Sequence, residues 1–165
     1  MEKYIVYKYC KTVQTYTEWS FNDTICKFGK RLSYDKELAK KKMLFSLVTR
    51  GKYQICYVHN TKGELIHYSF VIPYCVKFSF MQKRDLQIGP CWTNKEYRGQ
   101  GIYGRVLDYI AQRAISSNPD INLYVLIREA NIESTKGIHK TNYIPVGECI
   151  KTKYLKYYKK VEWYK

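Results

Sequence analysis

The chain has 165 residues, and its 29 lysines and arginines against 14 acidic residues give a net charge of +15. This length predicts a single domain over 1–165. No segment has the roughly twenty apolar residues of a membrane span, so no membrane insertion is expected. A basic surface favours anionic partners. However, the basic residues are spread along the chain without a dense block, so a lysine-biased composition explains them as well.

The six cysteines, at positions 10, 26, 56, 75, 91 and 149, form no C-x-x-C pair, so neither a metal site nor a redox motif is expected. Several lie in apolar, strand-like runs, where cysteine is usually a small buried hydrophobe. The N-terminal segment 1–11 alternates like a strand and lacks the apolar core of a signal peptide. We therefore expect reduced cysteines and a cytoplasmic protein.

The first half of the chain predicts a strand, a helix and a hairpin. Alternation predicts a strand over Tyr4–Tyr9, whereas 12–30 has no clear period. A helix is predicted over Asp35–Arg50, with Gly51 as its stop signal. Its cap would be Ser33 or Asp35, and its inner face would carry Leu44, Leu47 and Val48.

A β-hairpin follows in the predicted order of elements. Tyr53–Val58 and Glu64–Ile72 are both typical of strands, and the polar segment 60–63 between them is typical of a turn. Pro73 interrupts the second of these strands, because proline cannot donate to a sheet ladder.

The second half predicts a strand over Asp85–Thr93, a glycine-rich turn, a long helix over Ile102–Ser117 and a buried strand over Tyr124–Ile127. The long helix would bury one face made of Leu107, Ile110, Ala111 and Ala114. A short helix would begin near Asn131. Strands over 144–149 and 153–158 would complete the sheet, so the fold class is α+β or mixed α/β.

The glycine-rich turn spans Arg98–Gly104 and links a predicted strand to a predicted helix. Glycine lets the backbone bend sharply and approach a ligand closely. The helix that follows begins with unpaired N–H groups and the positive end of its dipole. Together these features favour a phosphate or pyrophosphate site.

With a second block at Leu123–Gly147, the chain resembles the GNAT superfamily of acyl-CoA-dependent N-acyltransferases. The first block resembles the family's Arg/Gln-x-x-Gly-x-Gly/Ala signature. The second resembles its strand, its Asn-x-x-Ser/Ala motif and its Lys-x-Gly-Phe ending. The matching residues are Arg98, Gly101 and Tyr103 in the first block, and Asn131, Ser134, Lys140, Asn142 and Tyr143 in the second.

Three positions depart from the family's pattern. Tyr103 stands where the family has a small residue, and Asn142 stands where it has glycine. Because asparagine tolerates the left-handed conformation, the helix cap at Asn142 is expected to survive. Ile138 occupies the position at which many relatives carry a general-acid tyrosine, so that role cannot be carried over.

The resemblance implies a central, mostly antiparallel twisted sheet flanked by helices, with a β-α-β core for acyl-CoA at about 85–147. Backbone groups around Cys91, Trp92 and Thr93 would hold the pantetheine arm like an added strand. The pyrophosphate would bind the turn formed by Arg98, Gly99, Gln100, Gly101, Ile102, Tyr103 and Gly104. Asn131 and Ser134 would contact the arm near the thiol, although both could instead cap a helix.

The catalytic acid and base are poorly marked. His67 lies in a predicted strand on the same face as Ser69 and could accept the proton of the amine. A structural histidine that makes its hydrogen bonds within the protein is the more frequent case. Cys91 has no evident histidine partner, so core packing is a stronger interpretation for it than nucleophilic catalysis.

The leading hypothesis is an N-acetyltransferase that transfers the acetyl group of acetyl-CoA directly to an amine of a small molecule, without a metal. The motif Arg-Gly-x-Gly-Ile-Tyr resembles members that acetylate amino sugars, including nucleotide-linked ones, for polysaccharide biosynthesis. The alternatives are a protein or peptide N-acetyltransferase and a non-catalytic, basic nucleic-acid-binding module. No DNA- or RNA-binding motif supports the last, so no specific nucleic-acid partner is expected. The protein would be a monomer or a homodimer.

Overall fold

A computed structural model describes residues 2–11, 24–30, 36–152 and 157–165. The strands are β1 (Glu2–Tyr9), β2 (Thr24–Gly29), β3 (Gln54–Asn60), β4 (Leu65–Pro73), β5 (Leu86–Thr93), β6 (Leu123–Arg128), β7 (Tyr143–Lys151) and β8 (Tyr158–Trp163). The α-helices are α1 (Lys36–Val48), α2 (Ile102–Ser117) and α3 (Ile132–Ile138). Single 3-10 turns, at Val76–Phe78 and Lys95–Tyr97, flank β5.

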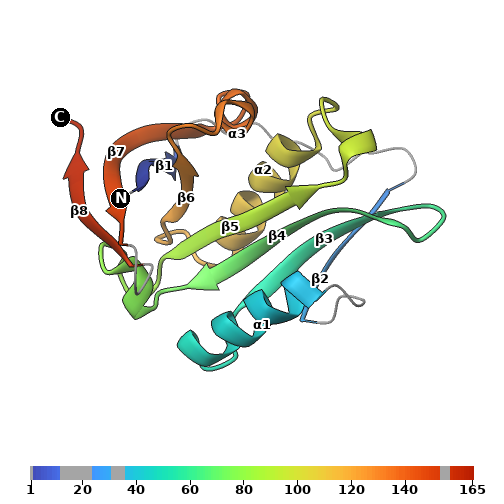
Figure 1. Ribbon diagram of the computed structural model, residues 1–165, viewed down its shortest axis with the longest axis horizontal. Coiled ribbons are helices and arrows are strands. Elements are labelled where there is room, and N and C mark those ends of the chain that lie inside the picture. Colours follow the sequence, from blue (N-terminus) through green and yellow to red (C-terminus); the bar gives the residue numbers. More distant parts are fainter. Residues whose placement is uncertain (1, 12–23, 31–35, 153–156) are drawn as a thin grey trace.

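The described strands form one sheet in the order β2-β3-β4-β5-β6-β1-β7-β8. β5 and β6 are parallel, and every other neighbouring pair is antiparallel. The expected mixed, mostly antiparallel sheet with flanking helices is therefore confirmed (Figure 1). The N-terminal strand β1 lies between β6 and β7, so the two ends of the chain meet in the same half of the sheet.

Two apolar cores cover the two faces of the sheet. On one face, α2 and α3 bury side chains that include Val106, Leu107, Ile110 and Ile138 against the strands. On the other face, α1 buries Leu38 and Phe45 together with Phe70 and Ile72 of β4. The predicted inner face of α2 is confirmed for Leu107, Ile110 and Ala111, which are fully buried, while Ala114 is partly buried.

The predicted inner face of α1 is wrong for Leu44 and Leu47 and confirmed for Val48, which is partly buried against the core. Leu47 is 79% exposed and Leu44 is 40% exposed, whereas Leu38 and Phe45 are buried. These two residues are seven positions apart, so they share a face of the helix. The ring of Phe45 contacts that of Phe70 with centroids 5.1 Å apart, and this contact fixes the rotation of the helix.

The boundaries of α1 agree with the prediction at one end. Gly51 has a φ of +72°, and its N–H donates to the carbonyl of Ser46 at 2.7 Å. This left-handed glycine closes the last turn, as the sequence predicts. The proposed caps, Ser33 and Asp35, lie outside the described residues.

The hairpin tests a further prediction. Asn60 and Gly63 close the turn between β3 and β4, since the N–H of Gly63 donates to the carbonyl of Asn60. Pro73 is the last residue of β4. The predicted strand 153–158 lies largely outside the described residues, which resume at 157, and β8 spans Tyr158–Trp163. The N–H of Thr152 donates to the carbonyl of Tyr157 at 2.8 Å.

Within the described residues, no helix is both long enough and apolar enough to cross a bilayer.

Candidate functional site

The parallel strands β5 and β6 are paired only at their beginnings. The register runs from Leu86 opposite Leu123 to Ile88 opposite Val125 and then stops. β5 continues to Thr93 and β6 to Arg128, and the two strands diverge (Figure 1). We call the region beyond this last pair the fork. There the edges of β5 and β6 that face each other have no ladder partner among the described strands, so their backbone groups are available to a ligand.

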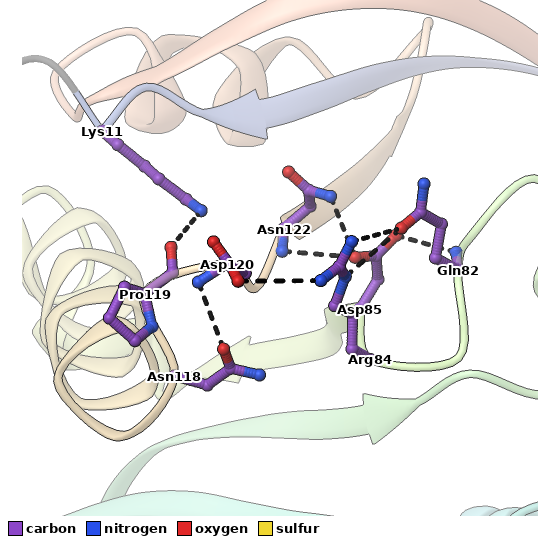
Figure 2. A network of polar contacts seen from close by, with 8 residues as sticks. All are labelled: Lys11, Gln82, Arg84, Asp85, Asn118, Pro119, Asp120 and Asn122. Atoms are coloured by element: carbon purple, nitrogen blue, oxygen red, sulfur yellow. Dashed lines mark hydrogen bonds and ion pairs between the residues drawn. The ribbon is translucent and has the colours of Figure 1, made fainter.

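A polar network clamps the closed end of the fork (Figure 2). Asp85, which is 1% exposed, accepts hydrogen bonds from the backbone and side-chain nitrogens of Asn122 at 3.2 and 3.0 Å. It also accepts one from the N–H of Gln82 at 2.8 Å. Because Asp85 precedes β5 and Asn122 precedes β6, this carboxylate fixes the starts of the two strands against each other.

A β-bulge turns the open end of β5 away from β6. Ser69 pairs with Cys91 and Val71 with Ile88, so two residues of β5, Gly89 and Pro90, lie opposite a single residue of β4. Gly89 has a φ of +124°, a conformation that side chains rarely adopt. A bulge of this kind bends its strand, which accounts for the separation of β5 from β6 after Ile88.

Gln87 lies beside the point of divergence and is 5% exposed. Its Nε2 donates to the carbonyl of Ile88 at 2.7 Å. Its Oε1 is buried and has no hydrogen-bond partner among the described residues. A buried acceptor without a donor is costly, so this oxygen marks a position where a ligand N–H would be stabilised.

The glycine-rich turn follows directly on the open end of β5. Gly99 and Gly101 have φ values of +79° and +76°, so both need the freedom of glycine. Arg98 holds the turn to the strand, since its Nε donates to the carbonyl of Thr93 at 3.1 Å. Gly101 is the N-cap of α2 and offers no capping side chain, and the first turn of α2 has no acidic residue. The positive end of this helix is therefore free to bind an anion.

Tyr103 lies in the first turn of α2 and packs next to the fork, on the face of the sheet that bears α2 and α3. A Cβ added to Gly137 of α3 would come within 2.8 Å of the Tyr103 ring, so the absence of a side chain at Gly137 makes room for it. The ring centroids of Tyr103 and His67 are 6.5 Å apart. Burial raises the pKa of Tyr103 well above its ordinary value, and the nearby Cys91 and Tyr7 add to this rise. The phenol therefore stays protonated.

α3 begins at the open end of β6. The side-chain Oδ1 of Asn131 accepts a hydrogen bond from the N–H of Ser134 at 3.2 Å. The capping alternative for Asn131 is thus present in the structure. Contact of these two residues with a pantetheine arm stays a prediction.

The expected left-handed cap at Asn142 is wrong. Among the described residues other than glycine, only Arg50 has a positive φ. Thr141 closes the end of α3 instead, because its hydroxyl donates to the carbonyl of Ile138 at 2.6 Å and accepts from the N–H of Tyr143 at 3.2 Å. The N–H of Asn142 reaches the carboxylate of Asp108 at 3.4 Å.

His67 is fully buried, and both of its ring nitrogens have partners. Nδ1 lies 2.8 Å from the hydroxyl of Thr93, and Nε2 lies 2.8 Å from the hydroxyl of Ser69. Ser69 in turn donates to the sulfur of Cys91 at 3.0 Å. A neutral imidazole satisfies this chain, with Nε2–H donating to Ser69 and Nδ1 accepting from Thr93.

Burial lowers the pKa of His67 to about 3. The ring is therefore neutral near pH 7, but its basicity is weak and its lone pair is already engaged. These observations favour the structural alternative over the catalytic one, and a role for His67 as general base stays a prediction.

Cys91 is not poised as a nucleophile. Burial raises the pKa of its thiol to about 12, and the hydrogen bond from Ser69 lowers it only in part. A protonated thiol is a poor nucleophile. This agrees with the sequence-based interpretation of Cys91 as a packing residue.

The structure gathers the sequence-predicted cofactor residues around the fork. Cys91, Trp92 and Thr93 form the open end of β5, Arg98–Gly104 follow it, and Asn131 and Ser134 begin α3 after β6. Their contact with a ligand stays a prediction. Within the described ranges, no three histidine, cysteine or acidic side chains are grouped so as to hold a metal ion.

Sequence reasoning missed three contributors to the site. The clamp of Asp85 and the free oxygen of Gln87 depend on contacts across the sheet, which no local pattern shows. The contact between Tyr103 and Gly137 could have been predicted from the sequence, because a bulky residue in one motif and a glycine in the other can compensate for each other in volume.

No protein-family model matches the chain, and no curated protein is similar to it at the sequence level. Solved structures are similar in fold. An acetyltransferase of the GNAT family from Colwellia psychrerythraea superposes with a TM-score of 0.62 at 12% identity, over 88% of this chain and 53% of that one. A second GNAT-family protein, from Novosphingobium aromaticivorans, gives 0.55 at 10% identity, over 89% and 61%. The match thus spans less than two thirds of either relative. This chain has the fold of the GNAT acetyltransferases.

Proposed function

We propose that this protein is an acetyl-CoA-dependent N-acetyltransferase that acts directly on an amine of a small molecule. The observation that carries the proposal is the fork. A parallel strand pair is fixed at its start by Asp85, separates after Ile88 and Val125, and leads directly into a glycine turn at a helix N-terminus. This arrangement offers an anion site and a pair of open strand edges side by side.

The donor would bind in two parts. The N–H groups of the turn at 98–104 would take the pyrophosphate, because the helix dipole and the left-handed glycines make that backbone accessible to an anion. The amide-containing pantetheine arm would lie against the open edge of β5 at Cys91–Thr93, as an added strand does. The acyl group would then lie in the fork.

The chemistry is a direct transfer. The nitrogen of a neutral amine attacks the thioester carbonyl, the C–N bond forms, the C–S bond breaks, and the proton lost by nitrogen is balanced by protonation of the sulfur. No acyl-enzyme is needed, which agrees with the protonated state of Cys91. The net charge of +15 supports an acceptor that carries an anionic group, such as a nucleotide-linked amino sugar.

Two measurements test this function. Isothermal calorimetry should show binding of acetyl-CoA, and a thiol-release assay over a panel of amines should show turnover that depends on both substrates. Free adenosine diphosphate should compete, because it shares the pyrophosphate. Absence of acetyl-CoA binding by the folded protein would contradict the proposal. Binding without turnover on any amine would leave a CoA-binding protein in place of an enzyme.

A further inference from the structure

The two faces of the sheet differ at the fork. On the face of α2 and α3, the fork is backed by helical residues, among them Ile102, Tyr103 and Ile138, which pack into the core there. On the opposite face, α1 and the segment 75–81 cover other parts of the sheet, among them Phe70 and Tyr124. At the open end of β5, the side chain of Trp92 is exposed on this face, and a second substrate can reach it there.

Trp92 projects from the open end of β5 onto that accessible face. It alternates with Cys91 and Thr93, whose side chains face α2, so its side chain points the other way. Its indole stacks on the ring of Tyr68 with centroids 5.6 Å apart and an interplanar angle of 17°. Tyr68 is 6% exposed, whereas Trp92 is 38% exposed.

The indole is held rigidly. Tyr68 meets Phe70 edge to face at 5.9 Å, and Phe70 packs on Phe45 of α1. A row of aromatic rings thus runs from the buried core to the exposed Trp92. A rigid aromatic surface loses little conformational entropy when a ligand stacks on it, so this residue is suited to recognition.

The same face holds an acceptor that lacks a donor. Gln87 lies on β5 on the other side of the bulge from Trp92, and its side chain points away from the core residue Ile88. Its Oε1 has no partner among the described residues. An amine brings N–H donors, which match this oxygen.

From these observations we infer that Trp92 is the acceptor-recognition residue, and that the acceptor is a primary amine carried by a six-membered ring whose flat face stacks on the indole. The inference rests on the proposed acetyl transfer. A flat ring covers the indole surface, whereas a linear amine would lose more conformational freedom for less contact. The net charge of +15 opposes linear polyamines, which carry several positive charges.

The test uses three acceptors with acetyl-CoA: glucosamine for a saturated ring, phenethylamine for an aromatic ring, and spermidine for a linear polyamine. At least one ring amine should react with a higher kcat/KM than spermidine. Trp92→Ala should raise the KM for that amine at least tenfold, far more than it changes the Kd for acetyl-CoA, because the pantetheine arm would contact only the backbone of residue 92. Trp92→Phe should give an intermediate KM.

Trp163→Ala is the matched control, because Trp163 is 50% exposed but lies on β8 at the far edge of the sheet. It should leave the KM unchanged. Preference for spermidine, or an unchanged KM in a folded Trp92→Ala variant, would overturn the inference while the acetyltransferase function stands.

A binding measurement separates the two failures. In the complex with CoA, the ring amine should quench tryptophan fluorescence in the wild type but not in Trp92→Phe. Quenching that depends on Trp92, without turnover of any amine, would support the recognition site and contradict the proposed catalysis. Equal affinity of the amine for the wild type and a folded Trp92→Ala variant, measured by calorimetry, would overturn the recognition site.

Discussion

Tyr103 of α2 lies against Gly137 of α3, and a methyl group at Gly137 would come 2.8 Å from Cδ1 of the tyrosine ring and 3.3 Å from Cε1. Gly137→Ala should therefore displace the Tyr103 ring and lower the free energy of unfolding by about 1–3 kcal/mol, the usual cost of overpacking. Chemical denaturation measures this change.

A double variant identifies the cause. Tyr103→Ala removes the ring that the new methyl group would meet, so Gly137→Ala should cost much less in that background than in the wild type. If the two costs were equal, the alanine would act through helix α3 alone and not through the contact with Tyr103.

Gly101→Val should abolish acetyl-CoA binding. In the free protein a Cβ at Gly101 meets only the side chain of Arg105 at 4.0 Å, so the added side chain has room. It would extend toward the backbone surface proposed to bind the pyrophosphate, and the left-handed φ of +76° adds strain.

Gly63→Val is the control for that strain. Gly63 has a φ of +80°, and no atom of the described residues lies within 4 Å of an added Cβ, but it lies in the hairpin between β3 and β4. Both variants should lose similar stability, and calorimetry should find that only Gly101→Val loses acetyl-CoA. Equal affinity of the two folded variants would remove the turn from the binding site.

Asp85→Ala should destabilise the protein by about 1–3 kcal/mol, because it removes a buried acceptor and leaves the partly buried donors of Gln82 and Asn122 without their partner. Asp120→Ala is the control from the same network, since the Asp120 side chain is 80% exposed and its carboxylate lies 3.8 Å from the guanidinium of Arg84. That variant should change the free energy of unfolding by less than about 0.5 kcal/mol. Similar losses in the two variants would show that Asp85 is not the clamp.

His67 predicts a pH dependence of stability. Its pKa falls from 6.5 to about 3 on folding, so between these values the unfolded chain binds a proton that the native protein does not. The free energy of unfolding should therefore decrease as the pH falls below 6.5, by up to about 1.4 kcal/mol for each pH unit. Above pH 7 the imidazole of His67 is neutral in both the folded and the unfolded chain, so this effect disappears.

Denaturation of His67→Gln at pH 7.5 and 5 isolates this contribution. The variant should lose less stability than the wild type between the two pH values. Equal acid sensitivity of the wild type and His67→Gln would mean that His67 already carries a proton in the native protein.

The sequence predicted those features that depend on local patterns. The period of α2 and the order strand, glycine turn, helix are local, and Leu107, Ile110 and Ala111 are buried as expected. The inner face of α1 was wrong for Leu44 and Leu47, because the contact of Phe45 with Phe70 decides which face is buried.

The candidate site was predictable in its residues but not in its geometry. The glycines predict a ligand-binding turn, and Asn131 predicts the start of a helix. The fork itself results from a buried carboxylate at one end of β5, a bulge at Gly89 and the separation of β6. Each depends on partners far away in the sequence, and so does the stacking of Trp92 on Tyr68.

Cys91→Ala should keep acetyl transfer within a few-fold of the wild-type rate. The thiol is a packing group whose pKa burial raises to about 12, so it holds almost no thiolate near pH 7. Loss of the sulfur also frees the hydroxyl of Ser69, which now donates to it at 3.0 Å. Some stability should therefore be lost, and Cys91→Ser should recover part of it by offering a new acceptor.

The measurement for Cys91→Ala is kcat by thiol release, with intact-mass analysis of the protein during turnover. An acetyl group trapped on Cys91, or a loss of activity in the alanine variant beyond its loss of folded protein, would replace direct transfer with a two-step mechanism through the cysteine.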